Sequence, residues 1–162
     1  MIQSMLPKSQ LLAQDAEADQ VILIALKCLE TRLRYCPEKQ FNNSPDVCAY
    51  LRLQLAHEQE EVFAALFLNN QNQLLRFEKL FFGTINEAVV YPRKIVKKSL
   101  EHNASKIIIA HNHPSENCTP SHHDTKMTQT IKDILKIIDV ELIDHIVVSH
   151  QETFSFAEHG LL

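Results

Sequence analysis

A short run of branched apolar residues that ends in two histidines constrains the fold of this chain more than any other feature. Residues 106–110 read Lys-Ile-Ile-Ile-Ala, and such a run is typical of a strand covered on both faces of a sheet. His111 and His113 follow, and Pro114 stops the strand because it has no N–H to donate. Side chains two residues apart in an extended segment point the same way, so both imidazoles can reach one ion while Asn112 points away.

A helix is predicted shortly after the histidines, with Asp124 near its start. Its apolar positions follow helical spacing, at Met127, Ile131, Ile134, Leu135 and Ile138. We therefore expect His111, His113 and Asp124 to converge between the end of a strand and the start of a helix. Two imidazoles and one carboxylate are a ligand set of catalytic zinc, which keeps its fourth position for water.

Asp124 also has a simpler interpretation. Ser121-x-x-Asp124 ahead of an apolar run is a capping box, in which Ser121 is the N-cap residue and Asp124 occupies the third helical position. The cap alone would account for both residues. The two interpretations are partly compatible, because Asp124 could bind a metal while Ser121 caps the helix.

These residues carry a resemblance to a known family. His111-x-His113-Pro114, followed by Pro120-Ser121-x-x-Asp124, resembles the JAMM (MPN-plus) metalloprotease motif, and the string HNHPSENCTPSHHD is similar to its bacterial RadC-like branch. The similarity covers roughly residues 44–162 and includes Phe82-Gly83-Thr84, Tyr91-Pro92-Arg93, Leu142-Ile143-Asp144-His145-Ile146 and Gly160-Leu161-Leu162.

The resemblance and the hydrophobic pattern together predict an α/β fold, with an MPN (JAB)-like mixed β-sheet flanked by helices. We expect a short N-terminal helical extension at residues 1–43 and a RadC-like MPN/JAMM domain at residues 44–162. Residues 1–14 are expected to be a weakly structured lead-in. Periodicity and capping signals then predict a helix at about 15–36, whose apolar face comprises Val21, Ile24, Ala25 and Cys28, with Leu29 as a further candidate. They also predict a helix at 45–56, strands at 62–68 and 73–82, a helix at 92–102, strands at 106–110 and 142–149, an edge strand at 154–156 and a tail at 157–162 that packs back.

The resemblance implies a zinc-dependent hydrolase of the metallopeptidase or isopeptidase type, which acts on a peptide or isopeptide bond through metal-activated water. Zinc would be held by His111, His113 and Asp124. In the JAMM pattern a glutamate just ahead of the first long strand lies beside that water as general base, and Glu61 matches it, with Glu60 as the alternative in register. These glutamates could instead belong to a solvated acidic run between a helix and a strand.

Ser121 has a second expected role, as a hydrogen-bond donor to the oxyanion that develops during hydrolysis. The positive end of the helix would favour the same negative charge. One residue departs from the RadC-like string, which normally carries glycine after His-Pro-Ser, whereas this chain has Glu116. A carboxylate there could change the loop, contact the metal or alter substrate access. Cys118 is a conceivable soft ligand, although the His/His/Asp set is adequate without it.

Composition narrows the class of protein further. At 162 residues the chain fits one domain whose core needs no disulfide. The four cysteines show no CxxC or other paired spacing, and neither a signal peptide nor an apolar span of membrane length is visible, so we expect a cytoplasmic protein without a membrane partner. The formal net charge of −4 provides no overall attraction to nucleic acid.

Two functions of other classes are compatible with the resemblance. A RadC-like protein could act on or near nucleic acid in DNA repair, or an MPN domain could be a non-catalytic scaffold. The basic helix at 92–102 could contact a phosphate backbone or be a solvated face, through Arg93, Lys94, Lys97 and Lys98. The helix-hairpin-helix DNA-binding region of many RadC-like proteins is expected to be absent. A zinc deaminase is excluded because its Pro-Cys-x-x-Cys signature is missing.

Overall fold

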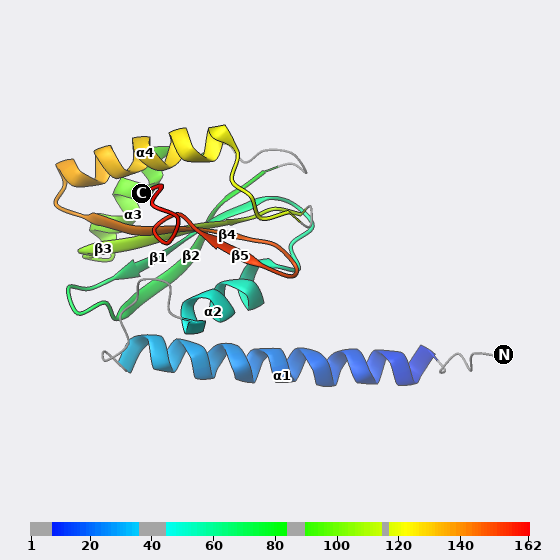
Figure 1. The fold of residues 1–162 in the computed structure, drawn as a ribbon. Coiled ribbons are helices and arrows are strands. Elements are labelled where there is room, and N and C mark those ends of the chain that lie inside the picture. Colours follow the sequence, from blue (N-terminus) through cyan, green and yellow to red (C-terminus); the bar gives the residue numbers. More distant parts are fainter. Residues whose placement is uncertain (1–7, 36–44, 84–89, 115–116) are drawn as a thin grey trace.

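Two apolar strands lie at the centre of a mixed sheet in the computed structural model (Figure 1). β1 (Val62–Leu68) is buried at every residue and β3 (Lys106–Asn112) at every residue but the first, as expected for strands covered on both faces. The strand order is β2-β1-β3-β4-β5, in which β3 and β4 are parallel and each other neighbouring pair is antiparallel. The predicted mixed α/β sheet is confirmed. The structure describes residues 8–35, 45–83, 90–114 and 117–162.

A helix connects the two parallel strands, because parallel neighbours cannot be joined by a tight turn. β2 (Leu74–Phe82) and the short β5 (Thr153–Ser155) are the edge strands. β3 leads into α4 (His122–Ile137), which returns the chain to β4 (Glu141–Val148). The carboxyl ends of β3 and β4 therefore lie at the same edge of the sheet, next to the start of α4.

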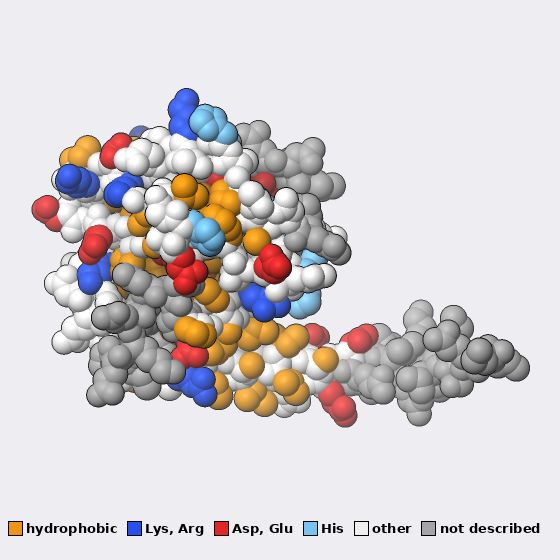
Figure 2. All heavy atoms as spheres, in the orientation of Figure 1, with side chains coloured by type: hydrophobic (Ala, Val, Ile, Leu, Met, Phe, Trp, Pro, Cys, Tyr) orange, Lys and Arg blue, Asp and Glu red, His pale blue; other side chains and the backbone are white. Residues whose placement is uncertain are grey.

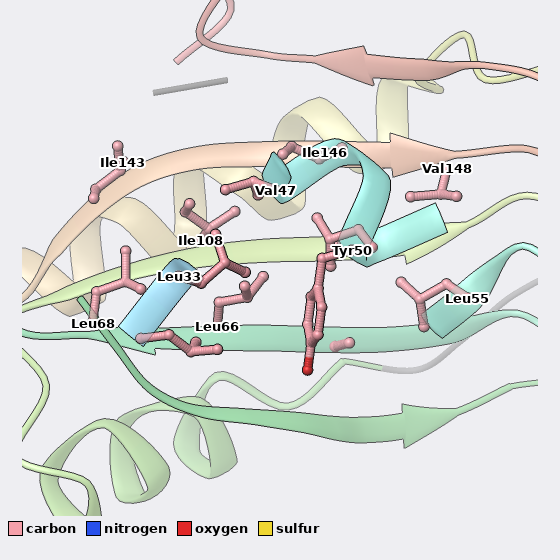
Figure 3. Close-up of a cluster of buried hydrophobic side chains, with 14 of the residues drawn as sticks. Leu33, Val47, Tyr50, Leu55, Leu66, Leu68, Ile108, Ile143, Ile146 and Val148 are labelled. Atoms are coloured by element: carbon pink, nitrogen blue, oxygen red, sulfur yellow. The ribbon is translucent and has the colours of Figure 1, made fainter. Parts of the chain in front are cut away.

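Helices cover both faces of the sheet. α1 (Lys8–Tyr35) and α2 (Pro45–Leu55) lie on one side, and α3 (Pro92–Glu101) and α4 lie on the other (Figure 1). Alternate residues of β1 contribute to the two cores, since side chains of a strand alternate between faces. Figure 3 shows the first core, in which Tyr50 of α2 packs near Leu66 of β1. The second core lies beneath α3 and α4.

The N-terminal helix begins earlier than the sequence predicts. α1 starts at Lys8, so the expected weakly structured lead-in is wrong for residues 8–14, and residues 1–7 lie outside the described part. The stretch Lys-Ser-Gln-Leu-Leu-Ala-Gln consists mainly of strong helix formers, which extend a helix without a clear apolar stripe. The division into an extension at 1–43 and a domain at 44–162 stays a prediction.

The face through which α1 packs also differs from the predicted one. Leu26 and Leu29 pack against the first core, and Leu33 is part of it. Val21 and Ile24 are 66% and 56% exposed, and Figure 2 shows hydrophobic side chains along the outside of this helix. Apolar residues occur on several sides of α1, so periodicity alone was right for Leu29 but wrong for Val21 and Ile24.

Other predicted boundaries agree with the structure within one or two residues. β3 continues two residues beyond the apolar run, so His111 and Asn112 are part of the strand. The tail packs back as predicted, because Leu162 lies against the second core and the Leu161 N–H donates to the Phe156 carbonyl at 2.8 Å. Within the described ranges, no helix has both the length and the apolar character needed to cross a membrane.

Candidate metal centre

His111 is held inside the sheet near the carboxyl end of β3. It pairs with Phe63 of β1 on one side and with Val147 of β4 on the other, and its residue is fully buried. The Phe63 ring stacks on the imidazole, with 6.5 Å between ring centroids and an interplanar angle of 11°. This packing leaves the ring little freedom, so its nitrogen atoms have fixed neighbours.

His113 lies one residue beyond the end of β3 and is anchored through its own backbone. Its N–H donates to the Val148 carbonyl at 2.8 Å, which continues the pairing with β4 past the strand. Its Nδ1 lies 2.9 Å from the Asn117 carbonyl oxygen. A carbonyl can only accept, so Nδ1 carries a proton and a neutral His113 ring has its free electron pair on Nε2.

Asn112 points away from the two histidines, as the alternation predicts, and has a structural task there. Its Oδ1 accepts from the Val62 N–H at 2.7 Å, and its Nδ2 donates to the carbonyls of Glu60 at 3.0 Å and Glu58 at 3.3 Å. The side chain thus ties the segment before β1 to the end of β3. That segment contains Glu61, whose position relative to His111 is fixed in this way.

Asp124 takes part in the capping box and also faces the histidines. Its N–H donates to Ser121 Oγ at 3.1 Å, while its Oδ2 accepts from the Ser121 N–H at 2.7 Å and from the Ser121 hydroxyl at 2.6 Å. Its Oδ1 lies 3.4 Å from His111 Nε2. The two interpretations of Asp124 are therefore compatible in the structure, because Oδ2 caps the helix while Oδ1 faces His111.

His111, His113 and Asp124 form one compact group of possible metal ligands, whose ligand atoms all lie within 4.8 Å of one another. The Nε2 atoms of the two histidines are 3.0 Å apart, and His113 Nε2 is 3.8 Å from Asp124 Oδ2. Two imidazole nitrogens and a carboxylate oxygen around one point are a donor set that suits zinc. The residues present therefore fit a metal ion.

The protonation states of His111 and Asp124 also suit a ligand set. Burial lowers the pKa of His111 to about 4, although the Asp124 charge opposes this, so the ring is neutral at pH 7. Burial alone would raise the pKa of Asp124, but its interactions with His113 and Ser121 outweigh burial and hold it below the usual range. Metal ligands must be deprotonated, and these two already are.

The Glu61 side chain is half-buried at the mouth of β1. It comes two residues before Phe63, which stacks on His111, and alternation places both on the same face of the strand. Contact with Asp124 raises the pKa of His113, and the negative charge of Glu61 acts in the same direction. Glu60 is exposed. Of the two glutamates, Glu61 is the less exposed, and its role as general base stays a prediction.

The other side chains that the sequence offers as ligands are not members of this group. Cys118 is buried against Val147 and Phe156, with its thiol 3.7 Å from a carboxylate oxygen of Glu152. His122 and His123 are exposed on the first turn of α4. Glu116, the departure from the RadC-like string, lies outside the described residues.

The basic surface of α3 is largely neutralised by neighbouring groups. Lys98 pairs with Glu78 at 3.3 Å and with Glu101 at 3.0 Å, and Lys97 lies 3.6 Å from Glu101. The Lys94 ammonium donates to a β2 carbonyl and lies over the Phe81 ring. These pairings give no support to a phosphate-binding role for this helix.

Two buried polar residues next to the group, Thr128 of α4 and His145 of β4, were missed as site residues by the sequence reasoning. His145 Nε2 lies 2.8 Å from His111 Nδ1, and Thr128 Oγ1 lies 2.6 Å from His145 Nδ1. A histidine inside the apolar run Leu-Ile-Asp-His-Ile-Val-Val was the available signal, because a buried strand seldom carries an ionisable residue without a specific partner.

A mixed sheet with a His/His/Asp group where a strand end meets a helix start defines a possible metallohydrolase domain of the JAB/MPN type. The chain matches the RadC-like JAB domain over residues 41–161, and it belongs to that family.

Relatives with this similarity occur in several bacteria. The chain is 48% identical over 150 residues to the UPF0758 protein Mpe_A2695 of Methylibium petroleiphilum, across 93% of this chain and 67% of that protein. It is 48% identical over 123 residues to a UPF0758 protein of Coxiella burnetii, across 76% of this chain and 55% of that protein. A UPF0758 protein of Vibrio cholerae is 43% identical over 152 residues, or 94% of each chain. The chain thus spans little more than half of some curated relatives and nearly all of another.

Proposed function

We propose that this protein is a zinc-dependent hydrolase that cleaves a peptide or isopeptide bond. The observation that carries the proposal is the convergence of His111 Nε2, His113 Nε2 and an Asp124 carboxylate oxygen within 4.8 Å of one another at a strand end. Membership in the RadC-like JAB domain family supports the same chemistry. Three protein ligands are what a catalytic rather than a structural zinc uses.

When bound, a zinc ion supplies the nucleophile, by lowering the pKa of a coordinated water to about 7, and polarises the carbonyl under attack. His111 and Asp124 would hold the ion from the interior of the protein, and His113 would hold it from the half-buried side. The fully buried His111 would exclude solvent behind the ion and leave the His113 side for substrate to approach.

Glu61 would act as general base and then as general acid. Its carboxylate would accept a proton from the attacking water and deliver it to the leaving amine. Asn112 supports this role through its three hydrogen bonds to the segment 58–62, which hold the backbone on either side of Glu61. The Gly83 N–H, which donates to the Glu61 carbonyl at 2.8 Å, fixes the same residue from β2.

Ser121 would stabilise the oxyanion of the tetrahedral intermediate. Its hydroxyl now donates to Asp124 Oδ2 at 2.6 Å, so it would have to turn from that oxygen toward the substrate. The Ser121 N–H would keep its own bond to Asp124 Oδ2 at 2.7 Å. The N-terminus of α4 would add partial positive charge near the same place.

The test compares Glu61→Gln with its neighbour Glu60→Gln. Zinc content is measured by elemental analysis, and hydrolysis by the appearance of new amino termini in a mixed peptide library. We expect the wild type and both variants to hold about one zinc per chain, the content of a single three-ligand site. Glu61→Gln should lose hydrolysis because an amide cannot take up the proton, and Glu60→Gln should retain it.

A double substitution, His111→Ala with His113→Ala, provides the metal-free control and should lose both zinc and hydrolysis. Unchanged zinc content in this variant would show that the metal is bound elsewhere. Zinc binding without hydrolysis of peptide or isopeptide bonds in the wild type would contradict the enzymatic part of the proposal and favour a scaffold.

A further inference from the structure

His145 lies behind His111, on the side away from Asp124. It is fully buried in β4, beside β3, and its ring stacks on Phe156 with 4.5 Å between centroids. Its Nε2 is 2.8 Å from His111 Nδ1, and its Nδ1 is 2.6 Å from Thr128 Oγ1. Both ring nitrogens therefore have one defined partner each. Neither partner is a carboxylate. The ring protons in the series of hydrogen bonds from Thr128 through His145 to His111 can therefore be assigned from its donors and acceptors.

The Thr128 hydroxyl sets the direction of the first hydrogen bond. Its Oγ1 lies 2.6 Å from the backbone carbonyl oxygen of Asp124, one turn earlier in α4. A carbonyl can only accept, and threonine in a helix commonly donates to the carbonyl four residues before it. The single hydroxyl proton of Thr128 is then directed to Asp124. Toward His145 the hydroxyl can only accept, so His145 Nδ1 must carry a proton.

The proton on His145 Nδ1 determines the proton positions on both imidazole rings. The His145 ring makes no hydrogen bond to a carboxylate, and its complete burial disfavours the charged form, so we take the ring as neutral. A neutral ring with a proton on Nδ1 has an electron pair on Nε2. His145 Nε2 therefore accepts from His111 Nδ1. His111, which is neutral as well, is left with its electron pair on Nε2, the atom that lies 3.4 Å from Asp124 Oδ1.

We propose that Thr128 and His145 are positioning residues that fix the tautomer of His111, so that its Nε2 electron pair is directed at the metal. The proposal rests on the role of His111 as a ligand in the proposed function. The hydrogen bonds run from the Asp124 carbonyl through Thr128 and His145 to His111, and we call this series the relay. One turn of α4 thus supplies the ligand Asp124 and also orients the ligand His111. His113 needs no such relay because the Asn117 carbonyl sets its tautomer directly.

The opposite tautomer gives a distinct state, in which His111 Nε2 could not bind a metal ion. If the Thr128 hydroxyl donated to His145 Nδ1, the protons would reverse along the chain, and His111 would carry its proton on Nε2. That proton could be donated to His113 Nε2, 3.0 Å away, and would occupy the place of the ion. Metal would then bind only after both rings had exchanged tautomers. The Thr128 hydroxyl, in its bond to Asp124, opposes this state.

The experiment uses the full chain labelled with ¹⁵N-histidine and stripped of metal with a chelator. Two-bond ¹H–¹⁵N spectra assign the proton on each ring. We expect Nδ1–H on both His145 and His111 in the wild type. Thr128→Val keeps the shape of the side chain but removes the acceptor for His145 Nδ1, so the Nε2–H forms of both rings should become populated. Zinc affinity, measured by competition with a chelator, should fall about 10- to 100-fold.

Two variants of the same helix serve as controls. Thr128→Ser retains a hydroxyl and should restore the wild-type tautomers and affinity. Thr130→Val removes an exposed hydroxyl that makes the same type of bond, to the Lys126 carbonyl at 3.0 Å, and should change neither. An Nε2–H form of His111 in the wild type, or tautomers unaffected by Thr128→Val, would overturn the relay. A wild type with the stated tautomers that binds no zinc would instead overturn the proposed function.

Discussion

Two adjacent residues of β4, Asp144 and His145, are both fully buried and both ionisable, yet they belong to networks of different kinds. His145 faces α4 and the candidate metal centre through Thr128. Asp144 faces the other way, toward β5 and the segment after it. The two residues share a strand, a depth and a sequence neighbourhood, so they differ mainly in their hydrogen-bond partners.

The network of Asp144 is closed within the protein. Its Oδ1 accepts from the N–H groups of His145 at 2.7 Å and Ala157 at 3.0 Å, and its Oδ2 accepts from the Ser155 hydroxyl at 2.6 Å. Ser155 Oγ in turn accepts from the Glu158 N–H at 3.1 Å. Every polar atom of the carboxylate has a protein partner, so this network holds β5 and the C-terminal segment on β4.

The network of His145 is open at one end. It runs from the Asp124 carbonyl through Thr128 and His145 to His111, whose Nε2 lies 3.0 Å from His113 Nε2 and 3.4 Å from Asp124 Oδ1. Buried polar atoms are normally satisfied, and an arrangement of acceptors around one point is completed by a cation. The difference between the two networks is that one ends within the fold, whereas the other ends at three residues that could hold a metal ion.

The largest effect should follow from Asp124→Asn, which removes charge from the open network but keeps a polar side chain at the helix start. A ligand role predicts a loss of zinc affinity of more than about 100-fold, beyond what residues behind the ligands usually contribute. The melting temperature should approach that of the chelator-stripped wild type, because bound metal no longer adds to stability. Calorimetry with and without zinc measures both effects.

A cap alone predicts a different result for the same variant. Asparagine is itself a good capping residue, so stability should then fall by about 1 kcal/mol or less and zinc content should stay at the wild-type value. Wild-type zinc affinity in Asp124→Asn would mean that Asp124 only caps α4. The centre would then need another third ligand, such as His122, His123, Glu116 or Cys118.

The second prediction concerns the closed network. Asp144→Ala leaves the Ser155 hydroxyl and the His145 and Ala157 N–H groups without their acceptor, and unfolding should become easier by about 3 kcal/mol. Asp144→Asn keeps one acceptor oxygen and offers a donor to Ser155 Oγ, so it should cost about 1 kcal/mol or less. Urea unfolding measures both. Zinc content should be unchanged in the folded variants, and its loss would show that the two networks are not independent.

The pH dependence of stability in the wild type and in Asp144→Asn provides a further test of the role of Asp144. Burial raises the pKa of this carboxyl above its usual value, although its hydrogen bonds oppose the shift. Its contribution to stability is therefore complete below the usual pKa of about 3.9 and declines as the pH rises through the raised value. Asparagine has no such titration. The stability deficit of Asp144→Asn should thus be larger at about pH 3.5 than at about pH 7.

The sequence predicted only one end of the open network, at His111, His113 and Asp124, which lie close together along the chain. His111 and His113 could be placed because alternation in a strand is a local property, and Asp124 because helix starts have local signals. His145 and Thr128 reach the centre through the parallel pairing of β3 with β4 and the packing of α4 on the sheet. Neither contact is encoded in local spacing. The predicted packing of Val21 and Ile24 of α1 was wrong for the same reason.

The smallest change in stability should come from Ser121→Ala, at the point where capping and the proposed chemistry meet. The substitution removes the acceptor for the Asp124 N–H and the hydroxyl that donates to Asp124 Oδ2, so it should cost about 1 kcal/mol of stability. Zinc should still bind at saturating concentration, because all three ligands remain. If Ser121 also stabilises the oxyanion, turnover should fall by about 10²-fold or more.

Ser121→Thr separates the two roles, because it restores a hydroxyl at the same place with one additional methyl group. We expect it to recover the stability of the helix start and much of the turnover. Urea unfolding and the peptide-library assay are run on both variants at saturating zinc. Full turnover in Ser121→Ala would restrict Ser121 to the helix cap. Only the ion and the N-terminus of α4 would then stabilise the oxyanion, and the proposed centre would have one catalytic side chain fewer.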